Sequence, residues 1–302
     1  MLEFNEISKE YRSAFGRRRH LALNRLSLRV ERGEIFGFLG GNGAGKTTSI
    51  HLAMGFMRAT GGSGTMLGRP FGHVGTRARV GFLGENFALY PRRADWLVRF
   101  YGALNGMADP RLRQRVAEVL REVGLEDRAG ENVKRMSRGM QQRIGIAQAF
   151  VNDPELVILD EPTSALDPFA RIAVRELLVK ARQAGKTVFL SSHLLSEVEN
   201  VCDRVAILRR GELVRVSPLR ELLEEQERFV IRARGGSVSQ LPGAEANHDA
   251  ALFTVGRSEQ REAIERIWNA GGEVLSVAPG RRSLEDAFVD LADPNRPPEV
   301  EA

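Results

Sequence analysis

Cysteine is nearly absent from this sequence. One cysteine, Cys202, occurs among 302 residues, which excludes a disulfide framework and a metal site built from several cysteines. The segment around it, EVENVCDRVAIL, has an apolar pattern. We therefore expect Cys202 to be a buried core thiol.

Long apolar runs are absent as well. No stretch approaches the roughly 20 apolar residues that a helix needs to cross a bilayer, and the start, MLEFNEISKEYR, lacks the apolar run of a signal peptide. We therefore expect a chain that is made and kept in the cytosol. The hydrophobic fraction of 42% is ample for a core of ordinary density, and the length favours one large domain with a small appendix.

Basic residues outnumber acidic ones, and the net charge of +5 is carried mostly by arginine. Such a charge attracts either nucleic acid or an anionic membrane face and phosphate ligands, and charge alone does not choose between them. The densest cluster, Arg17 to Arg19, lies beside Gly16 between two strand-like segments and contains no aromatic residue. This pattern favours a solvated loop, so we expect no nucleic-acid partner.

Strand-like and helix-like segments alternate over the first two thirds of the chain, which predicts an α/β fold with a partly parallel sheet. The expected strands are the alternating segment 26–30 and the apolar segments EIFGFL, VGFL, LVILD, TVFLSS and VAIL. Two helices have clear ends, one over 109–124 and one over 167–185. In the second helix, Asp167 is the expected cap and Pro168 the first helical residue.

The pattern changes at two places along the chain. Between about Asn86 and Phe150 the strand signal disappears, which predicts a helical subdomain inserted in the α/β core. After about Leu219, short strand-like pieces surround a helix at 258–268, and a last helix is expected at 284–291. We predict a first domain over 1–222 with a helical subdomain at about 86–150, a small α+β extension over 223–292, and a disordered tail over 293–302.

The strongest chemical signal is a glycine-rich loop between the strand EIFGFL and a helix-like segment, 50–57, with one apolar face. Glycines let successive backbone N–H groups turn toward phosphate oxygens, and the helix start adds its positive dipole end. Lys46 supplies a full charge to the outer phosphates, and Thr47 offers a hydroxyl to Mg²⁺. A chance glycine-rich turn does not account for the full spacing in this context. The loop consists of Gly40, Gly41, Asn42, Gly43, Ala44, Gly45, Lys46 and Thr47.

Two adjacent carboxylates end the apolar strand LVILDE. In a phosphoryl-transfer site, Asp160 can hold a metal ion or its waters, while Glu161 can orient or deprotonate the attacking water. A strand end with two surface acids is the alternative. The upstream phosphate loop and the immediately following Pro162 and Thr163 make it less attractive.

Together with these two elements, four further segments resemble the motifs of ATP-binding-cassette ATPases, in family order, and the resemblance covers about Leu2 to Leu223. The segment MSRGMQQR at 136–143 looks like their signature motif, in the variant seen in exporter subunits. The segment SALDP at 164–168 resembles their D-loop, and Ser191-Ser192-His193 resembles their switch histidine. Tyr11 stands where the family places an aromatic residue on adenine. The ending SLEDAFVDL is similar to the C-terminal extension of the same exporters.

The resemblance implies a phosphate-loop NTPase cassette with a mixed sheet, using ATP and Mg²⁺ as an ATPase. It implies a head-to-tail dimer of two copies of the chain, because the signature helix of one copy meets the γ-phosphate on the loop of the other. The helix capped by Ser137 presents free N–H groups at its start, as such a contact requires. The implied roles are catalysis by Glu161 and His193, metal binding by Thr47, Glu85 and Asp160, and nucleotide binding by the loop together with Tyr11, Thr48, Ser137, Gly139 and Met140.

The sequence departs from the family pattern at three places. Gly41 replaces the usual proline of the loop, which loosens the backbone but removes no ligand. Glu85 stands where glutamine is common, and its carboxylate adds negative charge near the phosphates, so we hypothesise that it still senses the metal but changes the affinity for it. Arg138 and Met140 replace the glycine and glutamine of the commonest signature, as in the exporter variant.

The resemblance also implies a separate transmembrane permease, which holds the chain at the inner face of the membrane. The segment after Glu85 and the residues 95–104 are expected to receive a short helix of that permease. Trp96, Phe100 and Tyr101 suit such a contact. A role for these aromatics in the core of the helical subdomain is an equally good interpretation.

The function that the resemblance implies is therefore the ATP-hydrolysing subunit of an ATP-binding-cassette exporter. The alternative is a soluble regulatory or nucleic-acid ATPase built on the same cassette. Such relatives usually carry two cassettes or a long coiled-coil insertion, and the sequence shows neither. A GTP-dependent switch or a small-molecule kinase leaves the signature segment and the D-loop unexplained.

Overall fold

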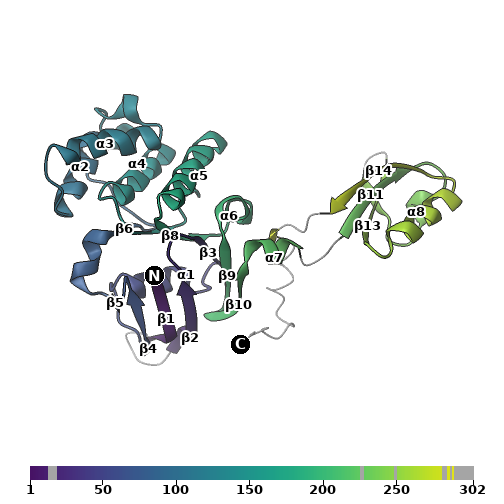
Figure 1. The fold of residues 1–302 in the computed structure, drawn as a ribbon, viewed down its shortest axis with the longest axis horizontal. Helices are drawn as coiled ribbons and strands as arrows, with labels where there is room; N and C mark the ends of the chain where they lie inside the picture. The colour runs from purple at the N-terminus through teal and green to yellow at the C-terminus, as the bar shows by residue number, and fades with distance from the viewer. Residues whose placement is uncertain (13–18, 225–227, 248–249, 281–283, 286–287, 289–302) are drawn as a thin grey trace. The chain divides into compact units, whose positions relative to one another are not determined.

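The computed structural model describes residues 1–12, 19–224, 228–247, 250–280, 284–285 and 288 (Figure 1). Their contacts divide them into two units, one from Met1 to Pro218 and one that begins at Leu219. The expected tail at 293–302, most of the expected helix at 284–291, and Arg17 and Arg18 lie outside the described residues. The domain boundaries given above remain predictions.

A six-stranded mixed sheet forms the centre of the first unit, in the order β10-β9-β3-β8-β7-β6. Neighbouring strands from β6 to β9 in this order are parallel, and β10 is antiparallel to β9. The parallel strands are largely buried apolar segments, as expected where both faces are covered. The strands are β3 (Ile35–Leu39), β6 (Val80–Leu83), β7 (Leu156–Asp160), β8 (Thr187–Ser192), β9 (Arg204–Arg209) and β10 (Glu212–Pro218).

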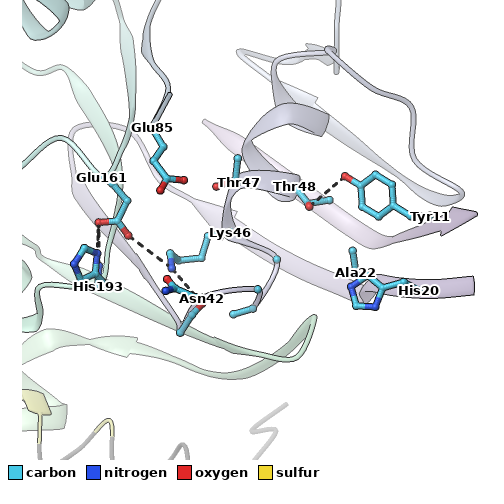
Figure 2. A pocket seen from close by; sticks show the side chains of 14 residues that line it. Tyr11, His20, Ala22, Asn42, Lys46, Thr47, Thr48, Glu85, Glu161 and His193 are labelled. Atoms are coloured by element: carbon cyan, nitrogen blue, oxygen red, sulfur yellow. Dashed lines mark hydrogen bonds and ion pairs between the residues drawn. The ribbon is translucent and has the colours of Figure 1, made fainter. Parts of the chain in front are cut away.

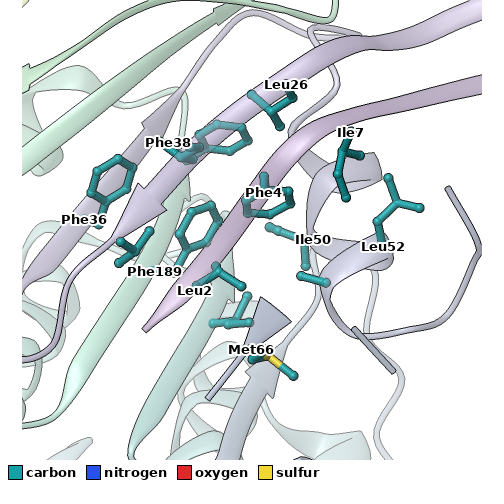
Figure 3. Packing of buried hydrophobic residues seen from close by; sticks show 14 of the residues in the cluster. Leu2, Phe4, Ile7, Leu26, Phe36, Phe38, Ile50, Leu52, Met66 and Phe189 are labelled. Carbon is teal, nitrogen blue, oxygen red and sulfur yellow. The ribbon is translucent and has the colours of Figure 1, made fainter. Parts of the chain in front are cut away.

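A second, antiparallel sheet has the order β2-β1-β4-β5. Its strands are β1 (Leu2–Arg12), β2 (Arg19–Val30), β4 (Gly61–Met66) and β5 (Arg69–Pro70). The main core joins residues of both sheets and of helix α1 (Lys46–Ala53). Figure 3 shows Phe4 from β1, Ile50 from α1, and Phe36 and Phe189 from the mixed sheet in this core; the last two rings stack with their centres 6.0 Å apart. The core thereby fixes α1, and the loop before it, against both sheets.

Between β6 and β7 the chain is mainly helical. The elements are α2 (Ala94–Leu104), α3 (Arg111–Glu122), two 3-10 turns, η2 (Glu126–Arg128) and η3 (Val133–Arg135), and α4 (Arg138–Phe150). These three helices contact one another, and α4 also packs on β6 (Figure 1). Helix α3 begins two residues after the expected start at Asp109.

The remaining helices of the first unit flank the mixed sheet. Helix α5 (Pro168–Gln183) packs on β8, and α6 (Leu195–Val201) lies against α5 and β3. The expected cap is present, because the side chain of Asp167 accepts a hydrogen bond of 2.9 Å from the backbone N–H of Ala170. A 3-10 helix, η1 (Val74–Arg79), precedes β6.

Cys202 is buried as predicted, and burial raises the pKa of its thiol.

The second unit is a small α+β structure. Its four-stranded antiparallel sheet has the order β12-β13-β11-β14, and α8 packs on one face of it over a core that includes Ile231, Phe253 and Ile267. The elements are α7 (Leu219–Glu224), β11 (Arg228–Arg234), η4 (Val238–Gln240), β12 (Glu245–Asn247), β13 (Ala250–Gly256), α8 (Gln260–Asn269) and β14 (Glu273–Gly280). Within the described part of the chain, no helix of either unit is long and apolar enough to span a membrane.

Candidate nucleotide-binding site

A cavity of about 730 Å³ opens where the loop between β3 and α1 meets the ends of β1 and β2. Figure 2 shows Glu161, His193 and Lys46 at one end of it, and Tyr11 and His20 at the other. The cavity is lined by Tyr11, His20, Ala22, Gly41, Asn42, Gly43, Ala44, Gly45, Lys46, Thr47, Thr48, Glu85, Glu161 and His193. Most residues of the predicted phosphate loop are thus brought together with Tyr11, Glu85, Glu161 and His193.

The glycine loop is held tightly at its two ends. Gly45, directly before α1, has φ +110°, and a Cβ there would lie 2.7 Å from the carbonyl oxygen of Ala22. Gly40 has no such dihedral, but a Cβ there would lie 2.6 Å from the carbonyl oxygen of Leu208. Both positions therefore require glycine for close backbone approach. Gly41 has open space around its Cβ position, so steric contact does not explain that residue.

Lys46 is 7% exposed and lies at the first position of α1. Its ammonium donates a hydrogen bond of 2.6 Å to the carbonyl oxygen of Gly40 and lies 3.7 Å from Oε1 of Glu161. The first N–H groups of a helix have no partner within the helix. A buried ammonium and a helix start therefore face the same cavity, which suits a polyanion.

Asp160 ends β7 and is 1% exposed. Parallel pairing places it beside Ser191 of β8, whose hydroxyl donates to Oδ1 of Asp160. Among the described residues, Oδ2 of Asp160 has no hydrogen-bond partner. A buried carboxylate oxygen without a partner is costly, and an oxygen ligand is what Mg²⁺ prefers. Asp160 is therefore chemically suited to hold the ion or one of its waters.

Glu161 follows at a sharp turn, with φ +52°, and is 7% exposed. Its backbone N–H donates to the carbonyl oxygen of Ser191 at 3.1 Å. Oε2 of Glu161 lies 2.6 Å from Nδ1 of His193, while Oε1 faces Lys46 (Figure 2). The carboxylate thus stands between the two groups that we expect to meet the terminal phosphate.

Tyr11 and Thr48 meet at the far end of the cavity. The Tyr11 hydroxyl lies 3.4 Å from Oγ1 of Thr48 and 3.4 Å from the sulfur of Met57. Tyr11 is 40% exposed and lines the cavity, so it is available to a ligand. Glu85, two residues after the end of β6, and Thr47 line this cavity and also a second cavity of about 340 Å³.

The signature residues lie apart from this cavity. Of the residues that the structure describes, Ser137, Gly139 and Met140 are not among those that line it. Ser137 caps α4, since its hydroxyl accepts a hydrogen bond of 3.2 Å from the backbone N–H of Met140. A Cβ on Gly139 would lie 3.1 Å from the carbonyl oxygen of Ala165, so the signature helix starts against the D-loop segment.

Three residues of the site were not assigned a role from the sequence. His20 and Ala22 line the cavity from β2, although nothing in the local sequence marks them. Gln142 of α4 donates a hydrogen bond of 3.4 Å to the carbonyl oxygen of Glu161. The apolar periodicity of the signature helix, which places Gln142 on its buried face, was the sequence signal that could have indicated this contact.

The fold and this loop define an ATP-binding cassette. The family model described as "ABC transporter" matches residues 23–164. An uncharacterised ABC transporter ATP-binding protein of Nostoc sp. is 40% identical, over 95% of this chain and 88% of its own length. The chain therefore belongs to the ABC transporter ATP-binding proteins, and it is an ATPase that uses ATP with Mg²⁺. The predicted family, fold class and activity are confirmed.

More distant relatives give further context. The linearmycin resistance ATP-binding protein LnrL of Bacillus subtilis is 35% identical, over 74% of this chain and 70% of its own. The Nod factor export ATP-binding protein I of Cupriavidus pinatubonensis is 35% identical, over 75% of this chain and 69% of its own length. A solved ATP-binding cassette, a dimer in a post-hydrolysis state with ADP and Pi, matches with a TM-score of 0.68 and 27% identity, over 73% of this chain and 99% of its own.

Proposed function

We propose that this chain is the ATP-hydrolysing subunit of an exporter, acting as a head-to-tail dimer on a separate membrane permease at the inner face of the membrane. The observation that carries the proposal is the separation of the signature residues from the nucleotide cavity within one chain. A second copy supplies them in a dimer. The export and resistance names of the relatives, and the dimeric cassette among the solved structures, support this function over a soluble regulatory or nucleic-acid ATPase.

At the signature helix, the cap leaves backbone N–H groups near Gly139 available to an anion. Ser137 is exposed and Gly139 is half-buried. In the proposed dimer these groups meet the γ-phosphate of ATP held by the loop of the other copy. Each of the two sites is complete only when both copies are present.

The residues of one chain divide the chemistry between them. Lys46 and the loop N–H groups bind the phosphates, and Tyr11 stacks on the adenine. Mg²⁺, when bound, neutralises charge on the phosphates; Thr47, Asp160 and Glu85 are the residues that would hold it or its waters. Glu161 accepts a proton from the attacking water.

The contacts of Glu161 suggest how the binding of ATP frees the catalytic base. Its two carboxylate oxygens face Lys46 and His193. A γ-phosphate attracts both of these groups, because it carries more charge than one carboxylate. We infer that ATP draws Lys46 and His193 away, which leaves Glu161 available as a base.

The permease contact is proposed at the second cavity, which is lined mainly by residues of α1, of β6 and the segment after it, and of α2. Phe56, Phe82, Phe87 and Tyr101 contribute to its lining. Outside it, Trp96 stacks on Phe100 with 5.2 Å between ring centres, and Trp96 remains 45% exposed. Exposed aromatic groups of this kind are common at the centre of protein interfaces.

The dimer is tested with Glu161→Gln, which should retain ATP without hydrolysing it. Light scattering should show a monomer without nucleotide and a dimer with Mg-ATP. The matched control is Glu161→Gln combined with Ser137→Arg, which places a bulky charge at the signature helix and should stay monomeric with ATP bound. The composite site would be contradicted if Glu161→Gln binds ATP but remains a monomer, both alone and with its permease.

A further inference from the structure

We propose that His20 forms, with Tyr11, a two-ring subsite for the purine base of ATP, and that His20 contributes to the preference for purine over pyrimidine nucleotides. The proposal rests on the proposed role of the cavity as the ATP site. His20 was not assigned a role by the sequence motifs, yet it lines the cavity together with Tyr11.

The strand register brings the two rings together. β1 and β2 are antiparallel, and Tyr11 is paired directly with His20. Directly opposed residues of an antiparallel pair project from the same face of the sheet, with Cβ atoms about 5 Å apart. Ala22 lies two residues beyond His20 and also lines the cavity, as the alternation of a strand requires. Figure 2 shows His20 and Ala22 on one strand and Tyr11 on its neighbour.

The Tyr11 ring is held in place by its neighbours. Its hydroxyl contacts Thr48 of α1, and the ammonium of Lys9 lies 5.4 Å from the ring centre. Lys9 is itself anchored, because its ammonium donates a hydrogen bond of 2.8 Å to the carbonyl oxygen of Arg58. The contact with Thr48 links the ring to the helix that carries Lys46 and Thr47. The base end is thereby placed at a set distance from the phosphate end.

Ala22 explains why a base can reach this subsite from the loop. Its carbonyl oxygen lies where a Cβ on Gly45 would clash, so β2 passes directly behind the loop. The short methyl side chain of Ala22 occupies little of the cavity between the loop and His20. A nucleoside can therefore extend from the phosphates held at Lys46 toward the two rings.

The chemistry of two neighbouring rings favours a purine. Base stacking on an aromatic side chain depends on overlap of ring faces, and every base has such a face. One ring covers about the area of a pyrimidine, whereas a fused purine extends further and gains contact with a second ring. His20 therefore adds affinity for ATP and adds less for CTP. The phosphate end makes the same contacts with both nucleotides, so it contributes nothing to this difference.

The experiment compares equilibrium binding of fluorescent ATP and fluorescent CTP to the full chain. His20→Ala should weaken ATP binding about fivefold to tenfold, the low end for loss of one base-stacking contact, and should weaken CTP binding much less. His20→Phe should preserve the preference, because it retains a flat ring. The matched control is Leu21→Ala, the next residue on β2, which is 48% exposed and alternates to the other face; it should change neither affinity.

Two results would overturn the inference: an unchanged ratio of ATP to CTP affinity in His20→Ala, or a loss in His20→Phe as large as that in His20→Ala. Lys46→Ala separates this outcome from failure of the proposed function. It should weaken both nucleotides equally and leave their ratio unchanged. If Lys46→Ala binds both nucleotides as the unaltered chain does, the cavity is not the triphosphate site, and the proposed function fails with it.

Discussion

The two ends of the nucleotide cavity are built in different ways. At the phosphate end, Lys46 and Glu161 are each 7% exposed and donate hydrogen bonds to the backbone carbonyl oxygens of Gly40 and Ser191, respectively. At the base end, Tyr11 is 40% exposed and His20 is an exposed residue of a strand end. Buried charges need fixed partners, whereas a stacking surface needs only a flat ring in the right place. The phosphate end is therefore the part where a single change should cost most.

The largest expected effect is at Glu161. Glu161→Gln keeps the shape of the side chain but removes the base, so hydrolysis should fall by about 10²–10⁴-fold while binding of fluorescent ATP is retained. The measurement is phosphate release at saturating Mg-ATP, beside a binding titration. Turnover close to that of the unaltered chain would assign the base to another residue.

A smaller effect is expected at Ser191. Ser191→Ala removes the hydroxyl that donates to Asp160, so the carboxylate loses the group that orients it. Loss of such an outer partner typically costs about 10–100-fold in metal affinity. The measurement is the Mg²⁺ concentration that half-maximally promotes ATP binding, and we expect it to rise about tenfold. Ser192→Ala, on the same strand, is the control; an equal shift in both variants would remove Ser191 from a specific role.

The smallest of these effects is expected at Glu85. Glu85→Gln removes one negative charge from the lining of the cavity, and the amide still offers an oxygen to the metal or its water. The Mg²⁺ dependence of ATP binding should shift by about twofold to fivefold, as expected for one charge in a partly solvated site. The ratio of ATP to CTP affinity should stay constant, since the change lies at the phosphate end. An unchanged Mg²⁺ dependence would count against a metal-sensing role.

The phosphate end was predictable because its residues fall in short contiguous motifs. The eight loop residues form one motif, and Asp160 and Glu161 end one apolar strand. The base end was only half predicted, because His20 meets Tyr11 through the register of β1 and β2. That ladder contains irregularities between Phe4 and Glu10, which simple alternation does not reveal.

Local capping residues mark the start of α5 and the end of α1. The cap at Asp167 was predicted and is present. The apolar face expected to run to Met57 was wrong in its extent, because α1 ends at Ala53. Gly55 adopts φ +73°, and a Cβ there would lie 2.2 Å from the Cα of Gly72. The helix stops at this glycine, because the N–H of Gly55 donates to the carbonyl oxygen of Leu52 at 3.0 Å and the N–H of Phe56 to that of His51 at 2.9 Å, which are the hydrogen bonds of a left-handed glycine cap.

Thr47 and Glu85 line both the nucleotide cavity and the second, aromatic-lined cavity. Because these residues line both cavities, binding at one can be coupled to binding at the other, whatever ligand occupies the second cavity. Any occupant that moves Glu85 and so changes the affinity for Mg-ATP by some factor must have its own affinity changed by Mg-ATP by the same factor. Measuring that factor from either side gives the same coupling free energy, so a peptide from a membrane partner can be titrated against nucleotide without following transport at all.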